Sequence, residues 1–264
     1  MECTFRDPSI IKKIVNALEH SVENLNLVAS KEGLRVAATN SSQTDMRQLV
    51  LTPDFFETFR CTEEESKFGL NMGLLKKFMS TAGPTDTIKW CGDLNKAIFN
   101  IEIISTGDNS IEKHWTLRLI DINEDELCPP PNTQFDVSMR ISSVMVSDWI
   151  NNCKLINGDF AIGVEKDKCI MVRCDSEEGT LNLKQSLPSV MANIFQTSEE
   201  FTSIMMTIGI KLAESLNTMI KCAPGVDIQM SPLFPLCSTC YLNPEKTSFI
   251  RLWIAPKHED DDDD

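Results

Sequence analysis

The chain has 264 residues, of which 42% are hydrophobic, so it is long enough to form one or two domains with sizeable cores. Its formal net charge is −14, from 39 acidic and 25 basic residues. This balance excludes a uniformly basic nucleic-acid-binding surface. It does not exclude a local basic face, because net charge does not fix where each basic residue lies.

No stretch approaches the ~18 uncharged apolar residues of a membrane helix. The first residues, Met1–Pro8, lack the basic and apolar parts of a signal peptide. We therefore expect an intracellular protein that does not bind membranes, and we expect its ten cysteines to be reduced thiols in the core.

The first half of the chain contains two predicted helices among strands. Asp7 can cap the first helix, in which apolar residues recur from Ile10 to Val22 at helical spacing. Asn71 can cap the second helix, which Gly83-Pro84 ends. The β-like segments predicted in this half are 25–29, 33–40, 46–51, 55–61, 87–91, 97–104 and 113–121.

The second half repeats this order. Predicted helices span 142–153 and 209–221, and the second of them ends at Cys222-Ala-Pro-Gly225. The pattern indicates an internal duplication. The β-like segments predicted in this half are 135–141, 158–164, 168–174, 179–185, 190–195, 202–208, 226–230, 236–242 and 248–255.

The duplication predicts two domains, at residues 1–120 and 135–257. Residues 121–134 join them and contain three consecutive prolines, which exclude a helix or a central strand. Residues 258–264 form an acidic tail that is too polar to pack.

Catalytic and metal-binding motifs are missing from the sequence. The three histidines, His20, His114 and His258, lie in different elements, and no Ser-His-Asp order or Gly-rich phosphate loop occurs. Cys237 and Cys240 form a lone CxxC within a β-like segment, where residues three apart point to opposite faces. We therefore predict no enzyme activity, no cofactor and no metal. A thiol-redox or zinc enzyme built on the CxxC is the alternative.

Lysines lie on the predicted outer faces of the helices, at Lys12, Lys13, Lys76 and Lys77 in the first half. Solvated helix faces are the commoner fate of lysine, and phosphate contact is the alternative.

Five segments together resemble the proliferating cell nuclear antigen family of sliding DNA clamps. Each is moderately specific, and they occur in the family's order over nearly the whole chain. They are Asn40-Ser-Ser-Gln-Thr-Asp-Met-Arg-Gln-Leu49, Phe55-Phe-Glu-Thr-Phe-Arg-Cys61, Gly69-Leu-Asn-Met-Gly-Leu-Leu-Lys-Lys77, Trp115-Thr-Leu-Arg-Leu-Ile-Asp-Ile122 and Phe249-Ile-Arg-Leu-Trp-Ile-Ala-Pro-Lys257.

The resemblance implies an α+β fold of two similar clamp domains, with antiparallel sheets outside and helices on the inner face of a closed homotrimeric ring. It implies a processivity factor that encircles duplex DNA without sequence preference. Implied partners are a clamp loader, a DNA polymerase and other proteins with PIP-box-like motifs, in the nucleus or at a viral replication site. The alternative is a subunit of a heteromeric checkpoint-type clamp.

The resemblance also implies three sets of site residues. The DNA-binding set is Lys12, Lys13, Lys76, Lys77, Arg140, Lys211 and Lys221. The partner-binding groove is Gln43, Thr44, Met46, Leu127, Pro129, Pro235, Trp253, Ile254, Ala255 and Pro256. The subunit interface is Phe78, Trp115, Leu117, Thr180, Leu181 and Leu183. For Met46 and Leu127, ordinary core positions are the alternative.

The sequence departs from the family in ways that bear on DNA affinity. Glu19, Ser80, Asp148 and Asn151 occupy positions where Lys or Arg is usual, and each lost cation removes a phosphate contact. Lys166 lies near the family's modified lysine, so modification there is a further hypothesis.

Overall fold

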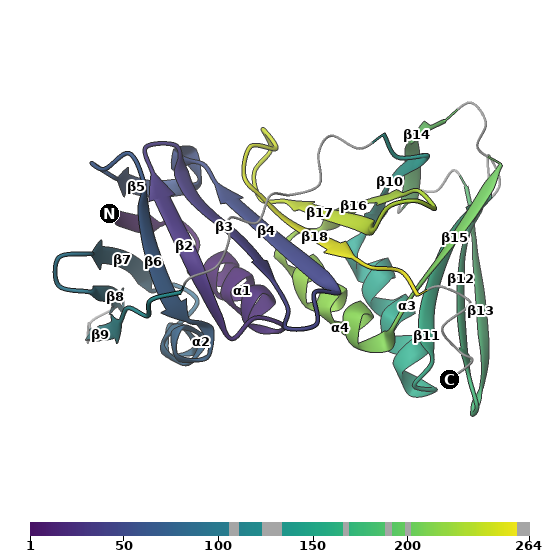
Figure 1. Cartoon of the computed structure of the whole chain (residues 1–264), viewed down its shortest axis with the longest axis horizontal. Helices are drawn as coiled ribbons and strands as arrows, with labels where there is room; N and C mark the ends of the chain where they lie inside the picture. The colour runs from purple at the N-terminus through teal and green to yellow at the C-terminus, as the bar shows by residue number, and fades with distance from the viewer. Residues whose placement is uncertain (106–110, 123–133, 166–168, 188–191, 199–201, 258–264) are drawn as a thin grey trace. The chain divides into compact units, whose positions relative to one another are not determined.

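The computed structural model describes residues 1–105, 111–122, 134–165, 169–187, 192–198 and 202–257. The chain divides into two compact units (Figure 1). Unit 1 comprises Met1–Pro129 and Tyr241–Ile250, and unit 2 comprises Pro130–Cys240 and Arg251–Asp264. The predicted Leu127, Pro129 and Lys166, and the tail at 258–264, lie outside the described residues.

Unit 1 combines antiparallel strands with two helices that pack together, α1 (Pro8–Glu19) and α2 (Met72–Ser80). One group of strands has the order β5-β1-β7-β8-β9, and a second has the order β4-β3-β2-β6. The strands are β1 (Glu2–Phe5), β2 (Asn24–Ser30), β3 (Gly33–Thr39), β4 (Asp45–Leu51), β5 (Phe56–Arg60), β6 (Ser66–Asn71), β7 (Thr87–Asp93), β8 (Ile98–Ile104) and β9 (Glu112–Arg118).

Both helices of unit 1 begin as the sequence predicts. The Asp7 carboxylate accepts hydrogen bonds from the backbone N–H groups of Ser9 (2.8 Å) and Ile10 (3.4 Å), which caps α1. The Asn71 side chain accepts one from the N–H of Leu74 (2.9 Å), which caps α2. The apolar face of α1 is buried at Ile11, Ile14, Val15, Ala17 and Leu18.

Aromatic side chains fill much of the core of unit 1. The Phe5 ring meets Trp90 edge-on at 4.7 Å, Trp90 meets Phe99 at 5.5 Å, and Phe99 meets Phe68 at 5.9 Å. Gly92 lies beneath Phe68, where a Cβ would stand 2.4 Å from a ring carbon. Only glycine therefore allows this ring to lie against the strand.

Unit 2 has the same ingredients, with α3 (Ser143–Leu155) packed on α4 (Ile210–Met219). One sheet has the order β13-β12-β11-β15, and another group has the order β14-β10-β16-β17. The strands are β10 (Val137–Ser142), β11 (Asp159–Glu165), β12 (Cys169–Ser176), β13 (Gly179–Ser186), β14 (Ala192–Thr197), β15 (Ser203–Ile208), β16 (Gly225–Met230) and β17 (Leu236–Tyr241).

The last strand, β18 (Phe249–Ile254), begins in unit 1 and ends in unit 2. The described elements follow one order twice: a strand, a helix, five strands, a helix and three strands. This order confirms the predicted α+β class.

The sequence predictions missed two strands and misplaced some boundaries. The strands β1 and β6 were not predicted, because β1 has only four residues and β6 contains Gly69, which lowers strand propensity. Gly69 is needed there because a Cβ would stand 1.9 Å from the carbonyl oxygen of Ile120. Predicted segment 113–121 ends as a strand at Arg118, after which Ile120 N–H bonds to the Gly69 carbonyl at 2.9 Å.

Predicted segment 55–61 begins with a 3-10 turn, η1 (Pro53–Phe55), before strand β5. Among the described helices, none is long and apolar enough to cross a membrane.

Candidate functional site

The basic residues predicted to contact DNA in unit 1 differ in how available their charges are. Lys13 and Lys77 are exposed and make no ion pair among the described residues. The Lys12 ammonium donates to the carbonyl oxygen of Ala82 at 2.5 Å. Lys76 lies 2.7 Å from the Glu19 carboxylate. Two of the four lysines are thus available, and two already have partners, at Glu19 on α1 and at Ala82 just after α2.

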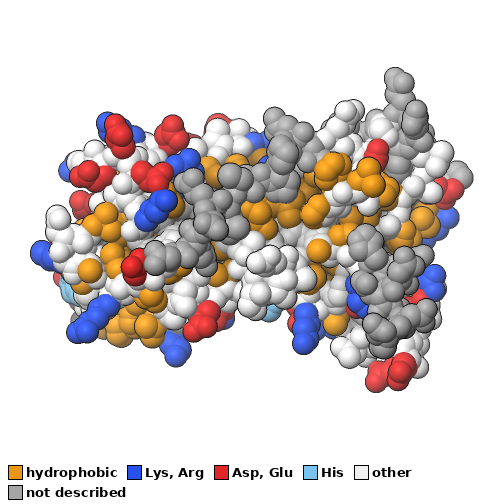
Figure 2. All heavy atoms as spheres, viewed as in Figure 1, with side chains coloured by type: hydrophobic (Ala, Val, Ile, Leu, Met, Phe, Trp, Pro, Cys, Tyr) orange, Lys and Arg blue, Asp and Glu red, His pale blue; other side chains and the backbone are white. Residues whose placement is uncertain are grey.

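Unit 2 shows the same division. Lys211, in the first turn of α4, and Lys221, in the 3-10 turn η2 (Ile220–Cys222), are exposed. Arg140 lies on β10, and its Nε stands 2.9 Å from the Asp227 carboxylate. On the face that Figure 2 shows, basic and acidic side chains are intermixed and form no continuous basic stripe.

Three of the predicted departures from the family also take part in local contacts. Glu19 holds Lys76, as described above. The Ser80 hydroxyl donates to the carbonyl of Lys77 at 2.7 Å. The Asn151 side-chain oxygen accepts from the Asn217 amide at 3.2 Å, which joins α3 to α4. Glu19 and Asn151 therefore link the two helices of their units, whereas Ser80 bonds within α2.

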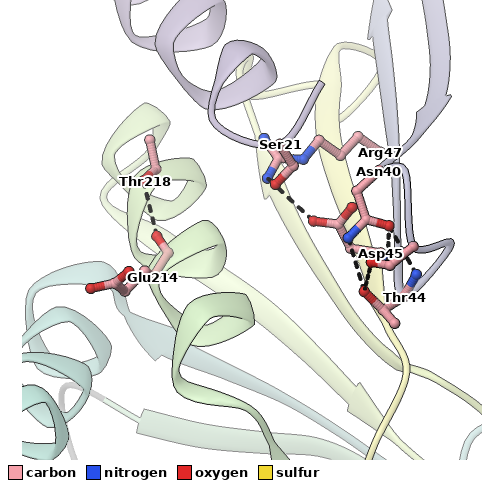
Figure 3. A network of polar contacts seen from close by, with 8 residues as sticks. Ser21, Asn40, Thr44, Asp45, Arg47, Glu214 and Thr218 are labelled. Atoms are coloured by element: carbon pink, nitrogen blue, oxygen red, sulfur yellow. Dashed lines mark hydrogen bonds and ion pairs between the residues drawn. The ribbon is translucent and has the colours of Figure 1, made fainter. Parts of the chain in front are cut away.

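Asn40 closes the turn that carries Gln43 and Thr44, two predicted groove residues. Its side-chain oxygen accepts from the backbone N–H groups of Thr44 (2.9 Å) and Asp45 (3.2 Å), and its amide donates to the Thr44 hydroxyl at 2.8 Å (Figure 3). Gln43 is exposed and has a backbone φ of 56°, which residues other than glycine seldom adopt. The Asn40 bonds hold this strained turn in place.

Along Thr44 and the start of β4, predicted groove residues alternate with a buried ionic pair. Thr44 and Met46 are half-buried, whereas Asp45 and Arg47 are 2% exposed each. The Arg47 guanidinium lies 3.4 Å from the Asp45 carboxylate and donates to the Ser21 hydroxyl at 2.5 Å (Figure 3). Burial lowers the pKa of Arg47, and the charge of Asp45 opposes that shift. Arg47 thus links β4 to Ser21, two residues after the end of α1.

The C-terminal groove residues are less accessible than the sequence suggests. Trp253 is 6% exposed, with the Arg251 guanidinium over its ring at 5.4 Å, and Ile254 is fully buried. Pro235, Ala255 and Pro256 are half-buried. The structure therefore places the Ile254 side chain in the core.

Two exposed apolar residues beside Pro235 were missed. Leu233 is 87% exposed, and Phe234 is 38% exposed with its ring 6.4 Å from that of Phe135. The signal in the sequence was the run Pro232–Pro235, in which two large apolar residues stand between prolines and cannot enter a regular core element.

Apart from Phe78 on α2, the predicted interface residues lie on strands at the edges of their sheets. In the described residues β9 pairs only with β8, and β13 pairs only with β12. Sheets end at β5 and β15 too, so these edges are two of several. The Phe78 ring from α2 stacks on Trp115 at 4.5 Å.

The individual side chains on these two strands are placed differently. Leu117 is 3% exposed and points into unit 1, so its side chain belongs to the core. Leu181 and Leu183 are half-buried on one face of β13, and Thr180 is exposed on the other. The Thr180 hydroxyl donates to the Asp175 carboxylate at 2.6 Å, which holds the pKa of Asp175 below its ordinary value.

The thiols of the CxxC are buried. Cys237 and Cys240 on β17 are 2% and 0% exposed. Burial raises the pKa of Cys237 to about 11 and raises that of Cys240 well above its ordinary value. Because the reactive form of cysteine is the thiolate, these environments oppose redox chemistry or metal ligation.

Comparison with known proteins agrees with the fold. Residues 1–127 match the family model described as proliferating cell nuclear antigen, N-terminal domain. A proliferating cell nuclear antigen of Dictyostelium discoideum is 22% identical over 98% of this chain and 99% of its own length. One from Chaetomium thermophilum is 22% identical over 99% of this chain and 100% of its own length. A DNA polymerase sliding clamp of Methanopyrus kandleri is 22% identical over 94% of each chain.

A repeated α+β chain that aligns with such proteins from end to end has the fold of a sliding clamp. Residues 1–127 carry the N-terminal domain of the proliferating cell nuclear antigen family, and the whole chain is similar to members of that family from end to end.

Proposed function

We propose that this protein is a sliding clamp, which encircles duplex DNA and tethers a DNA polymerase and other enzymes to it. The observation that carries the proposal is the packed helix pair in each of two repeated units, with exposed lysines at Lys13, Lys77 and Lys211. Near full-length similarity to proteins named as sliding clamps supports it.

The mechanism requires topology rather than tight binding. A closed ring cannot leave DNA sideways, so a few lysine–phosphate contacts without base readout suffice, and these allow sliding. A polymerase held by the ring rebinds the primer end at high effective concentration. The protein supplies no catalytic step in this scheme.

Ring closure would use strand pairing between copies of the chain. We propose that β9 of one subunit pairs with β13 of the next, which removes two open sheet edges. The implied assembly is a homotrimer, placed on DNA by a clamp loader in the nucleus or at a viral replication site.

The oligomeric state is the first test. Light scattering across a dilution series should give a mass near three times 29.7 kDa. A stable monomer of 29.7 kDa would contradict the homotrimer and favour a heteromeric clamp. Leu183→Asp on β13 should reduce the mass to that of one subunit while leaving the circular dichroism spectrum unchanged.

DNA contact is tested by charge reversal with a matched control. Lys13→Glu with Lys77→Glu should abolish the clamp's stimulation of a polymerase on primed circular DNA. Lys31→Glu with Lys96→Glu changes the net charge equally on exposed residues outside the helices, and it should leave the stimulation intact. Equal loss in both double variants would refute the helix assignment.

Partner binding is proposed to use the turn at Gln43 and Thr44, together with Met46, Pro235 and the chain end at Trp253–Pro256. Because Trp253 is 6% exposed, Trp253→Ala would leave a cavity and is a poor probe. Met46→Ala removes a half-buried side chain and should weaken binding of a PIP-box-like peptide at unchanged ring mass. Unchanged peptide affinity would refute this part of the groove.

A further inference from the structure

Among the described residues, one short ion pair joins the two helices of each unit. In unit 1 the carboxylate of Glu19 lies 2.7 Å from the ammonium of Lys76. In unit 2 the ammonium of Lys154 lies 2.6 Å from the carboxylate of Glu214. In Figure 3 the Glu214 side chain points away from α4. The Thr218 hydroxyl donates to the backbone carbonyl of Glu214, within the same helix.

The two ion pairs occupy equivalent places. Glu19 is the last residue of α1, and Lys154 is the last but one of α3. Lys76 and Glu214 are each the fifth residue of the second helix of their unit. The positions match, but the charges are exchanged: the acid is on the first helix in unit 1 and on the second helix in unit 2.

Neither pair is placed to contribute much stability. Side-chain exposures are 44% for Lys76 and 28% for Glu19, and 45% for Lys154 and 34% for Glu214. Exposed ion pairs of this kind contribute little stability, because water and salt screen them. The contacts are nevertheless short and direct, so each ammonium carries a carboxylate that an incoming phosphate must displace.

The other lysines on these helices provide the comparison. Lys13, Lys77 and Lys211 are exposed and have no carboxylate partner among the described residues. The helix pairs therefore offer a phosphate two kinds of lysine. Some can bind it directly, whereas Lys76 and Lys154 can do so only after their carboxylate partners are displaced.

We propose that Glu19 and Glu214 set the affinity of the clamp for DNA by competing with phosphate for Lys76 and Lys154. This inference rests on the proposed function, because it requires that the helix pairs face DNA. Weakened contacts leave the ring mobile along the duplex while the topological link is kept.

The test is binding of a fluorescein-labelled 30-base-pair duplex, followed by fluorescence anisotropy between 50 and 200 mM salt. Glu19→Gln and Glu214→Gln each free one ammonium without removing it. Each freed lysine that gains a phosphate should steepen the slope of log K against log salt by about 0.9. For each such lysine, the advantage over the wild type should consequently be about threefold larger at 50 mM than at 200 mM salt.

Two further variants separate competition from general charge. Glu65→Gln removes the same charge from a strand-side ion pair, since Glu65 lies 3.5 Å from Lys67 and 3.6 Å from Arg35. It should leave the salt slope at the wild-type value. Adding Lys76→Gln to Glu19→Gln should remove the gain, because the freed ammonium is then lost.

The outcomes are distinct. An equal gain in Glu65→Gln, or wild-type slopes in Glu19→Gln and Glu214→Gln, would overturn the competition while leaving the clamp function intact. A wild-type ring that fails both to bind the duplex and to stimulate a polymerase would instead refute the proposed function. Light scattering and thermal melts show that each variant keeps its assembly and fold.

Discussion

Asn40 offers the sharpest test of how the predicted partner-binding turn is held. Asn40→Ala removes two acceptor bonds to backbone N–H groups, at 2.9 and 3.2 Å, and one donor bond to the Thr44 hydroxyl at 2.8 Å. A hydrogen bond contributes roughly 0.5–1.5 kcal/mol net, and a buried group left without a partner costs about 1–3 kcal/mol. Thr44 is half-buried and Asp45 is 2% exposed, so water can replace only part of the loss. We expect the variant to lose about 2–3 kcal/mol of unfolding free energy.

The assay is urea denaturation followed by tryptophan fluorescence, with the slope m compared between variants. The corresponding fall in melting temperature is roughly 4–12 °C. Asn40→Asp keeps both backbone acceptors, and the Thr44 hydroxyl can turn to donate to the carboxylate, so this variant should recover most of the loss. If Asn40→Ala unfolds within about 0.5 kcal/mol of the wild type, the side chain does not hold the turn.

Three further predictions concern packing, backbone conformation and pH. Gly92→Ala should lower the unfolding free energy by about 1–3 kcal/mol in the same urea titration, because its Cβ would stand 2.4 Å from a Phe68 ring carbon. The control is Gly73→Ala on α2, where the nearest atom is 3.5 Å away, and this variant should be neutral or stabilising. Ala97→Gly should raise the unfolding free energy by about 0.5–1 kcal/mol, since Ala97 has a φ of 50°; a lower urea midpoint would contradict this reasoning. Burial raises the pKa of the Cys237 thiol from 9.0 to about 11, so the thiol loses its proton more readily in the unfolded state. The stability that the protonated thiol contributes is therefore complete below pH 9 and is lost as the pH rises through 11. The urea midpoint of Cys237→Ser should therefore fall less between pH 9 and 11 than that of the wild type, and parallel curves would show that this thiol is not the cause.

Local patterns in the sequence were enough to predict the helices and most strands. Asp7 and Asn71 cap helices where the pattern placed them, because a cap depends on one side chain and the next few N–H groups. The strand β6 was missed because Gly69 is explained by a long-range contact with Ile120, which no local pattern contains. The same limit applies to Arg118, where the strand ends for a tertiary reason.

Side-chain partners in the candidate site could not be predicted from residue type. Lys13 and Lys76 look alike in the sequence, yet one is exposed and the other is held by Glu19 at 2.7 Å. Trp253 and Ile254 were predicted in a groove from the family resemblance, but their burial depends on neighbours far along the chain. The exposed Leu233 could have been found from its position between prolines.

The exchanged charges of the two helix pairs bear on how the chain folds. Because its halves repeat one order of elements, the chain faces the risk that a helix from one half docks on the complementary helix of the other. Docking α1 on α4 would set Glu19 against Glu214, and docking α3 on α2 would set Lys154 against Lys76. Both mismatches place like charges where the native pairs attract at 2.7 and 2.6 Å. The reversal therefore disfavours both non-native dockings, by an amount that the exposure of these side chains keeps small.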